Sequence, residues 1–355
     1  MTIHFILLLL ALILFILSLD KKNFKFVTSM FFILFFVIAF ILVAFRSENV
    51  GNDTASYVAF FNVAGYYDSL QELLNNTRFE PGYVLLNYFV SRMTDDYTIF
   101  FLIYSLINLG CTIYFFRKYC FNKNAWPILW LIWATFYWSF SAIRASMAVC
   151  LVYMFFDAVL QNKIKKAILW LLIAGSFHSS ALVAGICLIV KLPVFREVKK
   201  HSFLLVIVFL CLGAALGQLI SLLPDYYSGY YTNSAYAEGG MRIASLMDFL
   251  MLSFCYIVTR PSYNSIEEWQ YAIEFNLFFL LAIGFSFLGL LFNPFNRIEM
   301  FFIPMAIVYM VNSCRYISQL KKMGLILGSC IVGTYQIVAF LIRPEWLSIF
   351  PYSFR

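Results

Sequence analysis

The feature that this 355-residue chain has least of is charge. Charged residues make up 12% of the sequence and hydrophobic residues 63%. A water-soluble domain carries about a quarter charged residues and cannot cover its surface with so few. Apolar runs of about 20 residues, long enough to cross the hydrocarbon core, recur from end to end. We therefore expect an all-α, polytopic transmembrane helix bundle, and a water-soluble fold is excluded.

The sequence also lacks the short motifs that mark nucleotide-driven and metal-dependent enzymes. It has no Walker loop, no HExxH, no GxSxG and no dinucleotide fingerprint. Its eight cysteines form no CxxC pair, so neither zinc nor disulfides are indicated. We expect no cofactor and no metal ion. The net charge of +7 is better explained by membrane topology than by a nucleic-acid partner.

The apolar runs predict about ten full spans within a single integral membrane domain over 1–355. The first, Ile3–Leu19, has no basic leader and no small-x-small cleavage pattern, so we expect a retained span rather than a signal peptide. The spans are predicted at about 2–19, 25–45, 98–116, 126–140, 143–160, 203–223, 244–259, 270–292, 300–314 and 323–342.

Lysine separates the connecting segments into two kinds. Loops near 21–25, 118–123, 163–166, 191–200 and 321–322 are rich in lysine, and the positive-inside rule places them in the cytoplasm. The remaining segments contain arginine but no lysine and are expected on the outer face. They are the outer loops 46–97 and 224–243, the turn near 141, residues 293–299 and the C-terminus.

Two apolar segments are too short or too interrupted to be full spans. Residues 167–190 lie between two lysine-rich loops, so the chain must enter and return on the same side. Gly175 and the cluster Ser176–Ser180 interrupt this run, which predicts two half-length helices that meet at His178. One ordinary helix beside a misplaced basic loop is the alternative. Residues 83–93 form either an outer-surface helix or a second half-helix.

With this threading, unusual ionisable residues gather at the outer face. Such groups are costly at membrane depth and are functional candidates by default. Each alone has a plainer explanation: Asp53 as a helix N-cap, Glu80 as the end of a loop, and His178 as a satisfied interior histidine. Their shared location is the stronger signal. The gathered residues are Arg46, Asp53, Glu80, Arg144, His178 and Arg297.

Arginines at this surface point to a lipid-linked phosphate. Guanidinium forks match phosphate oxygens, and three of them could stabilise a departing pyrophosphate. A reaction on the outer face has no ATP or nucleotide sugar at hand, which also favours a lipid-linked donor. We therefore predict that Arg46, Arg144 and Arg297 bind pyrophosphate.

The carboxylates and the histidine suit work on an acceptor hydroxyl. Asp53, Glu80 or His178 would orient it or take its proton, and the choice among them stays open. Neighbouring polar and aromatic residues are expected to contact the substrate, with the aromatic rings suited to sugar faces. These predicted substrate-binding residues are Tyr57, Tyr83 and Asn296.

At these residues the chain resembles the EpsG-like branch of the Wzy-type polysaccharide polymerases. Two positions depart from the family pattern: Ala145 stands where members commonly carry Gln, and Asn52 replaces a small or hydroxyl residue. Neither departure removes a charged group. The likeness lies in FRSENVGNDTASYVAFF (45–61), FEPGYVLLN (79–87), IRASMAVCL (143–151), GSFHSSAL (175–182) and NRIEMFF (296–302).

The resemblance implies a GT-C-like membrane glycosyltransferase that joins undecaprenyl-pyrophosphate-linked oligosaccharide units into O-antigen or exopolysaccharide. It implies a cytoplasmic (inner) membrane protein whose site faces the periplasm or cell exterior, with membrane lipids and a polysaccharide chain-length regulator as further partners. An O-antigen ligase, or another transferase using the same donor, is the nearest alternative. A flippase or transporter would need pseudo-symmetric halves, and the sequence has no internal repeat.

Overall fold

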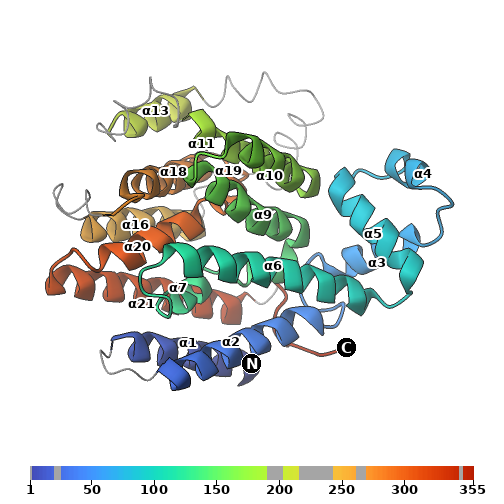
Figure 1. Ribbon diagram of the computed structural model, residues 1–355, viewed down its shortest axis with the longest axis horizontal. Helices are drawn as coiled ribbons and strands as arrows, with labels where there is room; N and C mark the ends of the chain where they lie inside the picture. The colour runs from blue at the N-terminus through green and yellow to red at the C-terminus, as the bar shows by residue number, and fades with distance from the viewer. Residues whose placement is uncertain (1, 20–24, 190–202, 216–242, 261–268, 344–346) are drawn as a thin grey trace. The chain divides into compact units, whose positions relative to one another are not determined.

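The computed structural model describes residues 2–19, 25–189, 203–215, 243–260, 269–343 and 347–355. Within these ranges every regular element is a helix, apart from one isolated bridge (Figure 1). The protein is therefore an all-α, multi-pass membrane protein. Six described helices are long and apolar enough to span: α1 (Thr2–Leu19), α2 (Lys25–Ala44), α6 (Tyr97–Tyr119), α9 (Ile143–Leu160), α18 (Ala272–Leu291) and α21 (Gln319–Ile342).

Shorter helices make up the rest of the described structure. Most of the predicted loop 224–243 and part of the predicted span 203–223 lie outside the described residues. The shorter elements are α3 (Thr54–Ala64), α4 (Leu70–Asn75), α5 (Pro81–Met93), α7 (Trp126–Ile132), α8 (Trp138–Ser141), α10 (Ile164–Phe177), η1 (Ser179–Gly185), α11 (Ile186–Ile189), α13 (Phe203–Ala214), α16 (Ile243–Thr259), α19 (Phe295–Glu299) and α20 (Ile303–Ser313).

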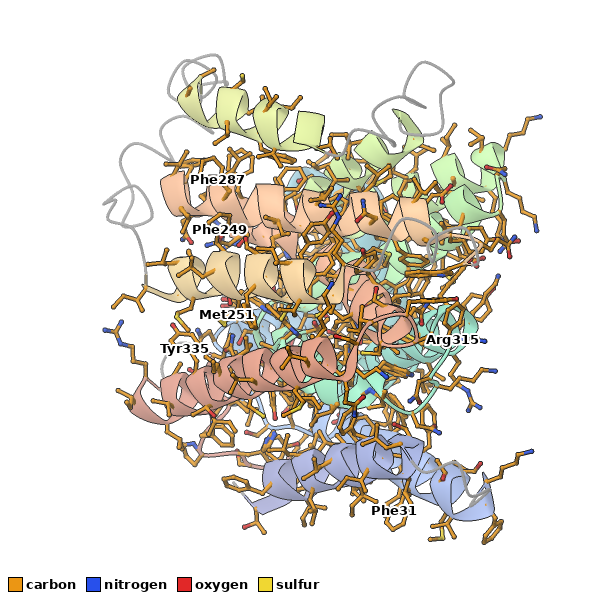
Figure 2. All side chains as sticks on the ribbon, turned by 90° about the vertical axis from the view of Figure 1, so that its left-hand side faces the viewer. Phe31, Phe249, Met251, Phe287, Arg315 and Tyr335 are labelled. Atoms are coloured by element: carbon orange, nitrogen blue, oxygen red, sulfur yellow. The ribbon has the colours of Figure 1, made fainter. Side chains whose placement is uncertain are left out.

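Large apolar side chains cover the outer faces of the spanning helices. On α1, Leu9 and Ile16 are each more than half exposed, and Figure 2 shows Phe31 pointing outward from α2. Continuous apolar surface of this kind is rare on water-soluble proteins and fits contact with lipid. The exposed faces thus agree with the membrane assignment made from composition.

The described chain divides into two compact units. One comprises Met1–Gly185 with Gly333–Arg355, and the other comprises Ile186–Val332, so α21 contributes to both. In the second unit, α18 packs against α13, α16, α19 and α20. Phe249 and Phe287 face each other between α16 and α18, with ring centroids 5.8 Å apart (Figure 2). The single membrane domain expected over 1–355 stays a prediction.

Helix α9 forms the centre of the first unit. Of its residues 89% are buried, the highest share among the candidate spans, and it packs between α6 and α10. Small side chains such as Ala145, Ser146 and Ala148 allow this close approach. Because α9 is fixed on several sides, the residues of its first turn have defined positions.

The predicted span 126–140 is interrupted. Helix α7 ends at Ile132 and α8 begins at Trp138. Between them Ala134 adopts a left-handed conformation with φ of 54°, which breaks the helical hydrogen-bond pattern. Trp126 nevertheless anchors α7, because its ring stacks on Phe116 with centroids 4.5 Å apart.

The break expected at His178 is present. Helix α10 ends there, and η1 returns along it, with Leu182 against Gly175 and Gly185 against Leu171. A Cβ on Gly175 would lie 2.6 Å from the end of the Leu182 side chain, so a larger residue at this position would require Leu182 to shift. The return begins as a 3₁₀ helix rather than an α-helix.

The last nine residues, Leu347–Arg355, form a C-terminal strap along segment 45–51. The Ser47 amide donates to the Ser353 carbonyl (3.0 Å), and the Arg355 amide donates to the Phe45 carbonyl (3.1 Å). The Ser141 hydroxyl donates to the Leu347 carbonyl (2.8 Å). Three segments that were all expected on the outer face therefore meet at one end of the first unit.

We predict that the strap can be cross-linked to this segment. The Ser47 and Ser353 hydroxyl oxygens are 2.6 Å apart. A Ser47→Cys/Ser353→Cys double variant should form a disulfide on mild oxidation. After proteolysis between the two positions, the fragments should stay joined on a non-reducing gel, with each single variant as control. Fragments that separate as readily as in the single variants would contradict the strap.

Candidate functional site

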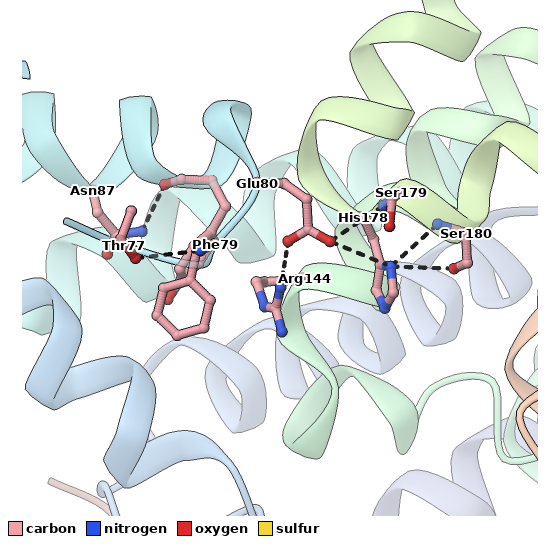
Figure 3. A network of polar contacts seen from close by, with 9 residues as sticks. Thr77, Phe79, Glu80, Asn87, Arg144, His178, Ser179 and Ser180 are labelled. Atoms are coloured by element: carbon pink, nitrogen blue, oxygen red, sulfur yellow. Dashed lines mark hydrogen bonds and ion pairs between the residues drawn. The ribbon is translucent and has the colours of Figure 1, made fainter. Parts of the chain in front are cut away.

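An ion pair between Arg144 and Glu80 forms the centre of the candidate site (Figure 3). Arg144 lies in the first turn of α9, and its Nη1 donates to Glu80 Oε2. Glu80 is the N-cap residue of α5, but its side chain makes no capping hydrogen bond and instead reaches Arg144. The two side chains are 24% and 17% exposed, so the pair is partly shielded from water.

His178 approaches the same carboxylate from α10. Its Nδ1 lies 3.6 Å from Glu80 Oε1, and the Ser179 amide donates to that oxygen at 3.2 Å. The Ser180 hydroxyl lies 3.2 Å from His178 Nδ1 (Figure 3). The carboxylate of Glu80 therefore joins α5, α9 and the α10–η1 turn.

The sequence around Glu80 explains this close approach. Pro81 starts α5 at a position where its fixed φ suits the helix and no amide donor is needed. Gly82 lies directly against the end of α10, because a Cβ there would be 2.2 Å from the Ser176 hydroxyl and 2.8 Å from its carbonyl oxygen. Any side chain at position 82 would push α5, and with it Glu80, away from His178.

Aromatic residues surround the guanidinium of Arg144. Its Cζ lies 4.7 Å from the Phe79 ring centre and 6.0 Å from that of Tyr83. Arg144 also lies near enough to Tyr57 for its charge to act on the phenol. Burial raises the pKa of Tyr57, although the nearby Arg144 charge acts against this shift, so Tyr57 is a neutral phenol at neutral pH. The arginine is thereby held on an aromatic surface.

Asp53 lies beside these residues at the start of α3. It occupies the N-cap position but its side chain makes no capping hydrogen bond, so the capping explanation does not account for the carboxylate. Its loop is docked on the turn before α9, since the Thr54 hydroxyl donates to the Phe140 carbonyl at 3.0 Å. Gly51 has φ of 98° and touches the same carbonyl, which only glycine allows.

Arg46 is fully buried in the first unit. Its Nη1 donates to the Ser139 carbonyl at 3.1 Å, and its Cζ lies 4.5 Å from the Phe101 ring centre and 5.3 Å from that of Phe140. Burial lowers the pKa of Arg46 to about 10, which leaves the group charged at neutral pH. Its Nε and Nη2 have no hydrogen-bond partner among the described residues.

Arg297 and Asn296 belong to the second unit. Arg297 is exposed on α19. Asn296 donates to the Ser245 hydroxyl at 2.7 Å and packs against Gly289, so its amide connects α19 to α16 and α18. The first unit brings together Asp53, Tyr57, Glu80, Tyr83, Arg144 and His178. That Arg297 and Asn296 join them stays a prediction.

Sequence reasoning missed several contributors to the site. Phe79 stacks on Arg144, the Ser179 amide binds Glu80, and Gly82 sets the spacing of the helices. The signal available for Gly82 was its place in Pro-Gly directly after a charged residue. The other two contacts depend on how α5, α9 and α10 pack, which no local pattern encodes.

This arrangement combines two chemical abilities. The guanidinium of Arg144 is partly exposed, and its buried Nε has no partner among the described residues, so the group has donor capacity beyond its pairing with Glu80. Beside it stand a carboxylate and an imidazole in contact distance, the pairing that proteins use to move a proton. The fold and this site define a multi-pass membrane protein in which an arginine, a carboxylate and an imidazole from three helices meet in the first unit.

Comparison with known proteins agrees with the resemblance. The model of the EpsG family matches residues 29–354, which is nearly the whole chain. The protein belongs to the EpsG family, and this membership supports a polysaccharide polymerase-like role. No curated protein and no solved structure matches the chain.

We predict that Gly82→Ala disrupts the site whereas Gly110→Ala does not. Forcing a Cβ into the α5–α10 contact should cost about 1–3 kcal/mol. The Cβ of Gly110→Ala meets nothing within 4 Å, so alanine there should be neutral or slightly stabilising. Thermal unfolding of both variants in the same detergent measures the difference. Equal melting temperatures would show that α5 and α10 do not touch at Gly82.

Proposed function

We propose that this protein polymerises lipid-linked oligosaccharide units by transferring the growing glycan from its polyisoprenyl pyrophosphate to a hydroxyl of the next unit. The observation that carries the proposal is the Arg144–Glu80–His178 cluster, which offers an anion-binding cation next to a proton-accepting pair. Family membership supports the polymerase-like role, and the chemistry of the cluster suggests the donor.

Arg144 would contact the pyrophosphate directly. As the bond between the anomeric carbon and the phosphate oxygen breaks, negative charge grows on the leaving group, and a preplaced guanidinium stabilises it. Arg46 lies deeper, near Tyr57, and would add positive charge from behind this surface. Arg297 is proposed as a third cation for the same leaving group. Arginine alone can supply this neutralisation, so the scheme requires no metal ion.

His178 would act as the base for the acceptor. The acceptor oxygen forms the new bond to the anomeric carbon, its proton passes to the imidazole, and the electron pair of the broken bond leaves with the pyrophosphate. Glu80 would be a positioning residue, because both of its oxygens are already engaged by Arg144, Ser179 and the imidazole. Asp53 and Tyr83 would contact the sugar units.

The reaction would take place at the outer face of the cytoplasmic membrane. The lysine-poor segments that carry the cluster are the ones that the positive-inside rule assigns to that face. Undecaprenyl pyrophosphate is the proposed carrier, and a chain-length regulator is a proposed partner. In a ladder assay, loss of a polymerase leaves single repeat units on the final acceptor, whereas loss of a ligase leaves none.

Substituting Arg144 with alanine should abolish long-chain polymer without lowering the amount of protein in the membrane. Loss of one charged hydrogen-bonding group at a transition state costs about 10²–10³ in rate. Arg92→Ala is the matched control, since Arg92 is exposed and, within the part of the chain that the structure describes, contacts the Tyr67 carbonyl and the Tyr88 ring. Ladder gels of a complemented deletion strain give the readout. Normal polymer from Arg144→Ala would remove it from the site.

A histidine base also predicts a particular pH dependence. A protonated imidazole cannot take up the acceptor's proton, so the rate of polymerisation by purified protein in liposomes should fall as the pH is lowered. His178→Gln should lower the rate and abolish its fall at low pH, the acid limb of the pH profile. Glu80→Gln should lower the rate but retain the limb, because it leaves the base in place. An acid limb that persists in His178→Gln would assign the base to another residue.

A further inference from the structure

A second feature of the first unit is a buried histidine without polar partners. His4, on α1, is 4% exposed, and neither of its ring nitrogens has a hydrogen-bond partner among the described residues. Four aromatic rings enclose it, those of Tyr137, Phe140, Phe350 and Tyr352, with centroids 5.0–6.1 Å away. Buried polar groups are almost always paired, so this one points to a ligand.

His4 lines an open cavity of about 70 Å³ between α1, α7 and α21. Its walls are mainly apolar, and Gln336 and Tyr137 are the other lining residues with polar side-chain groups. Phe5 and Leu341, which also line it, are each about half exposed on helices assigned to the membrane. The cavity is therefore reached from the lipid-facing surface.

The cavity adjoins the buried arginine. Phe140 separates the two: its ring centre is 6.1 Å from that of His4 and 5.3 Å from Cζ of Arg46. Tyr352 of the strap likewise contacts His4 and lies near Arg46. An apolar chamber thus lies beside a cation that has unused donors.

We propose that this cavity binds the isoprene units nearest the phosphate of a polyisoprenyl phosphate lipid, with His4 donating a hydrogen bond to a phosphate oxygen. The proposal rests on the proposed function and assigns the place of the lipid chain. An apolar wall, a lipid-side opening and one buried donor match a chain with a phosphate at its end. The neutral imidazole supplies one donor nitrogen, and Gln336 can bond to its other nitrogen or to the lipid.

A photoreactive polyisoprenyl phosphate tests the assignment. We expect a diazirine on its first isoprene units to label peptides around Leu8 and Ile337 of the full-length protein in nanodiscs. Gly333→Leu fills the cavity and should reduce this labelling about tenfold, and His4→Phe, which removes the hydrogen bond, should weaken it similarly. Gly110→Leu is the control, because it adds the same side chain where nothing lies within 4 Å.

The outcomes separate this proposal from the proposed function. Labelling that is unchanged in both cavity variants would overturn it, and so would equal labelling by a diazirine phosphatidylglycerol, which would make an ordinary phospholipid the occupant. If Gly333→Leu does not fold, the His4→Phe variant decides. Specific labelling together with normal polymer from Arg144→Ala would instead keep the cavity and refute the catalytic cluster.

Discussion

The ion pair between the Glu80 carboxylate and the Arg144 guanidinium, which is partly shielded from water, organises the first unit. Glu80 compensates Arg144, and the cost of leaving either charge unpaired at membrane depth is several kcal/mol. The same carboxylate accepts the Ser179 amide and faces His178, so one side chain fixes where α5, α9 and α10 meet. Gly82 makes the meeting sterically possible, and the close packing of α9 makes it rigid.

Arg46 and Arg144 differ in a way that matters for function. Arg144 is paired with a carboxylate and partly exposed, whereas Arg46 is fully buried, contacts rings and a carbonyl, and has two unpartnered nitrogens among the described residues. Both arginines interact electrostatically with the hydroxyl of Tyr57. The guanidinium of Arg46 has no carboxylate partner among the described residues and retains two unpartnered N–H groups, which favours an anion nearby.

Hydropathy was enough to predict the membrane class and most helices, because both follow from local composition. Lysine placement was enough to predict the break at His178, because the lysine-rich loops on either side of 167–190 require the chain to return to the same side of the membrane. Both patterns also placed Glu80, Arg144 and His178 at one surface. The interruption at Ala134 and the strap could not be predicted, since they depend on contacts between segments far apart in the sequence. The charge pattern puts Arg297 on the same face but cannot give its distance from Arg144.

The central claim is that a pyrophosphate lipid leaves each time two units are joined. Its most direct test uses purified protein in liposomes with a synthetic polyisoprenyl-pyrophosphate oligosaccharide as both donor and acceptor. Free polyisoprenyl pyrophosphate and new glycosidic bonds are counted over the same time course. We expect one pyrophosphate lipid to be released for each bond formed, without added nucleotide. Polymer that grows without release of that lipid, or donor that is translocated but never joined, would contradict it.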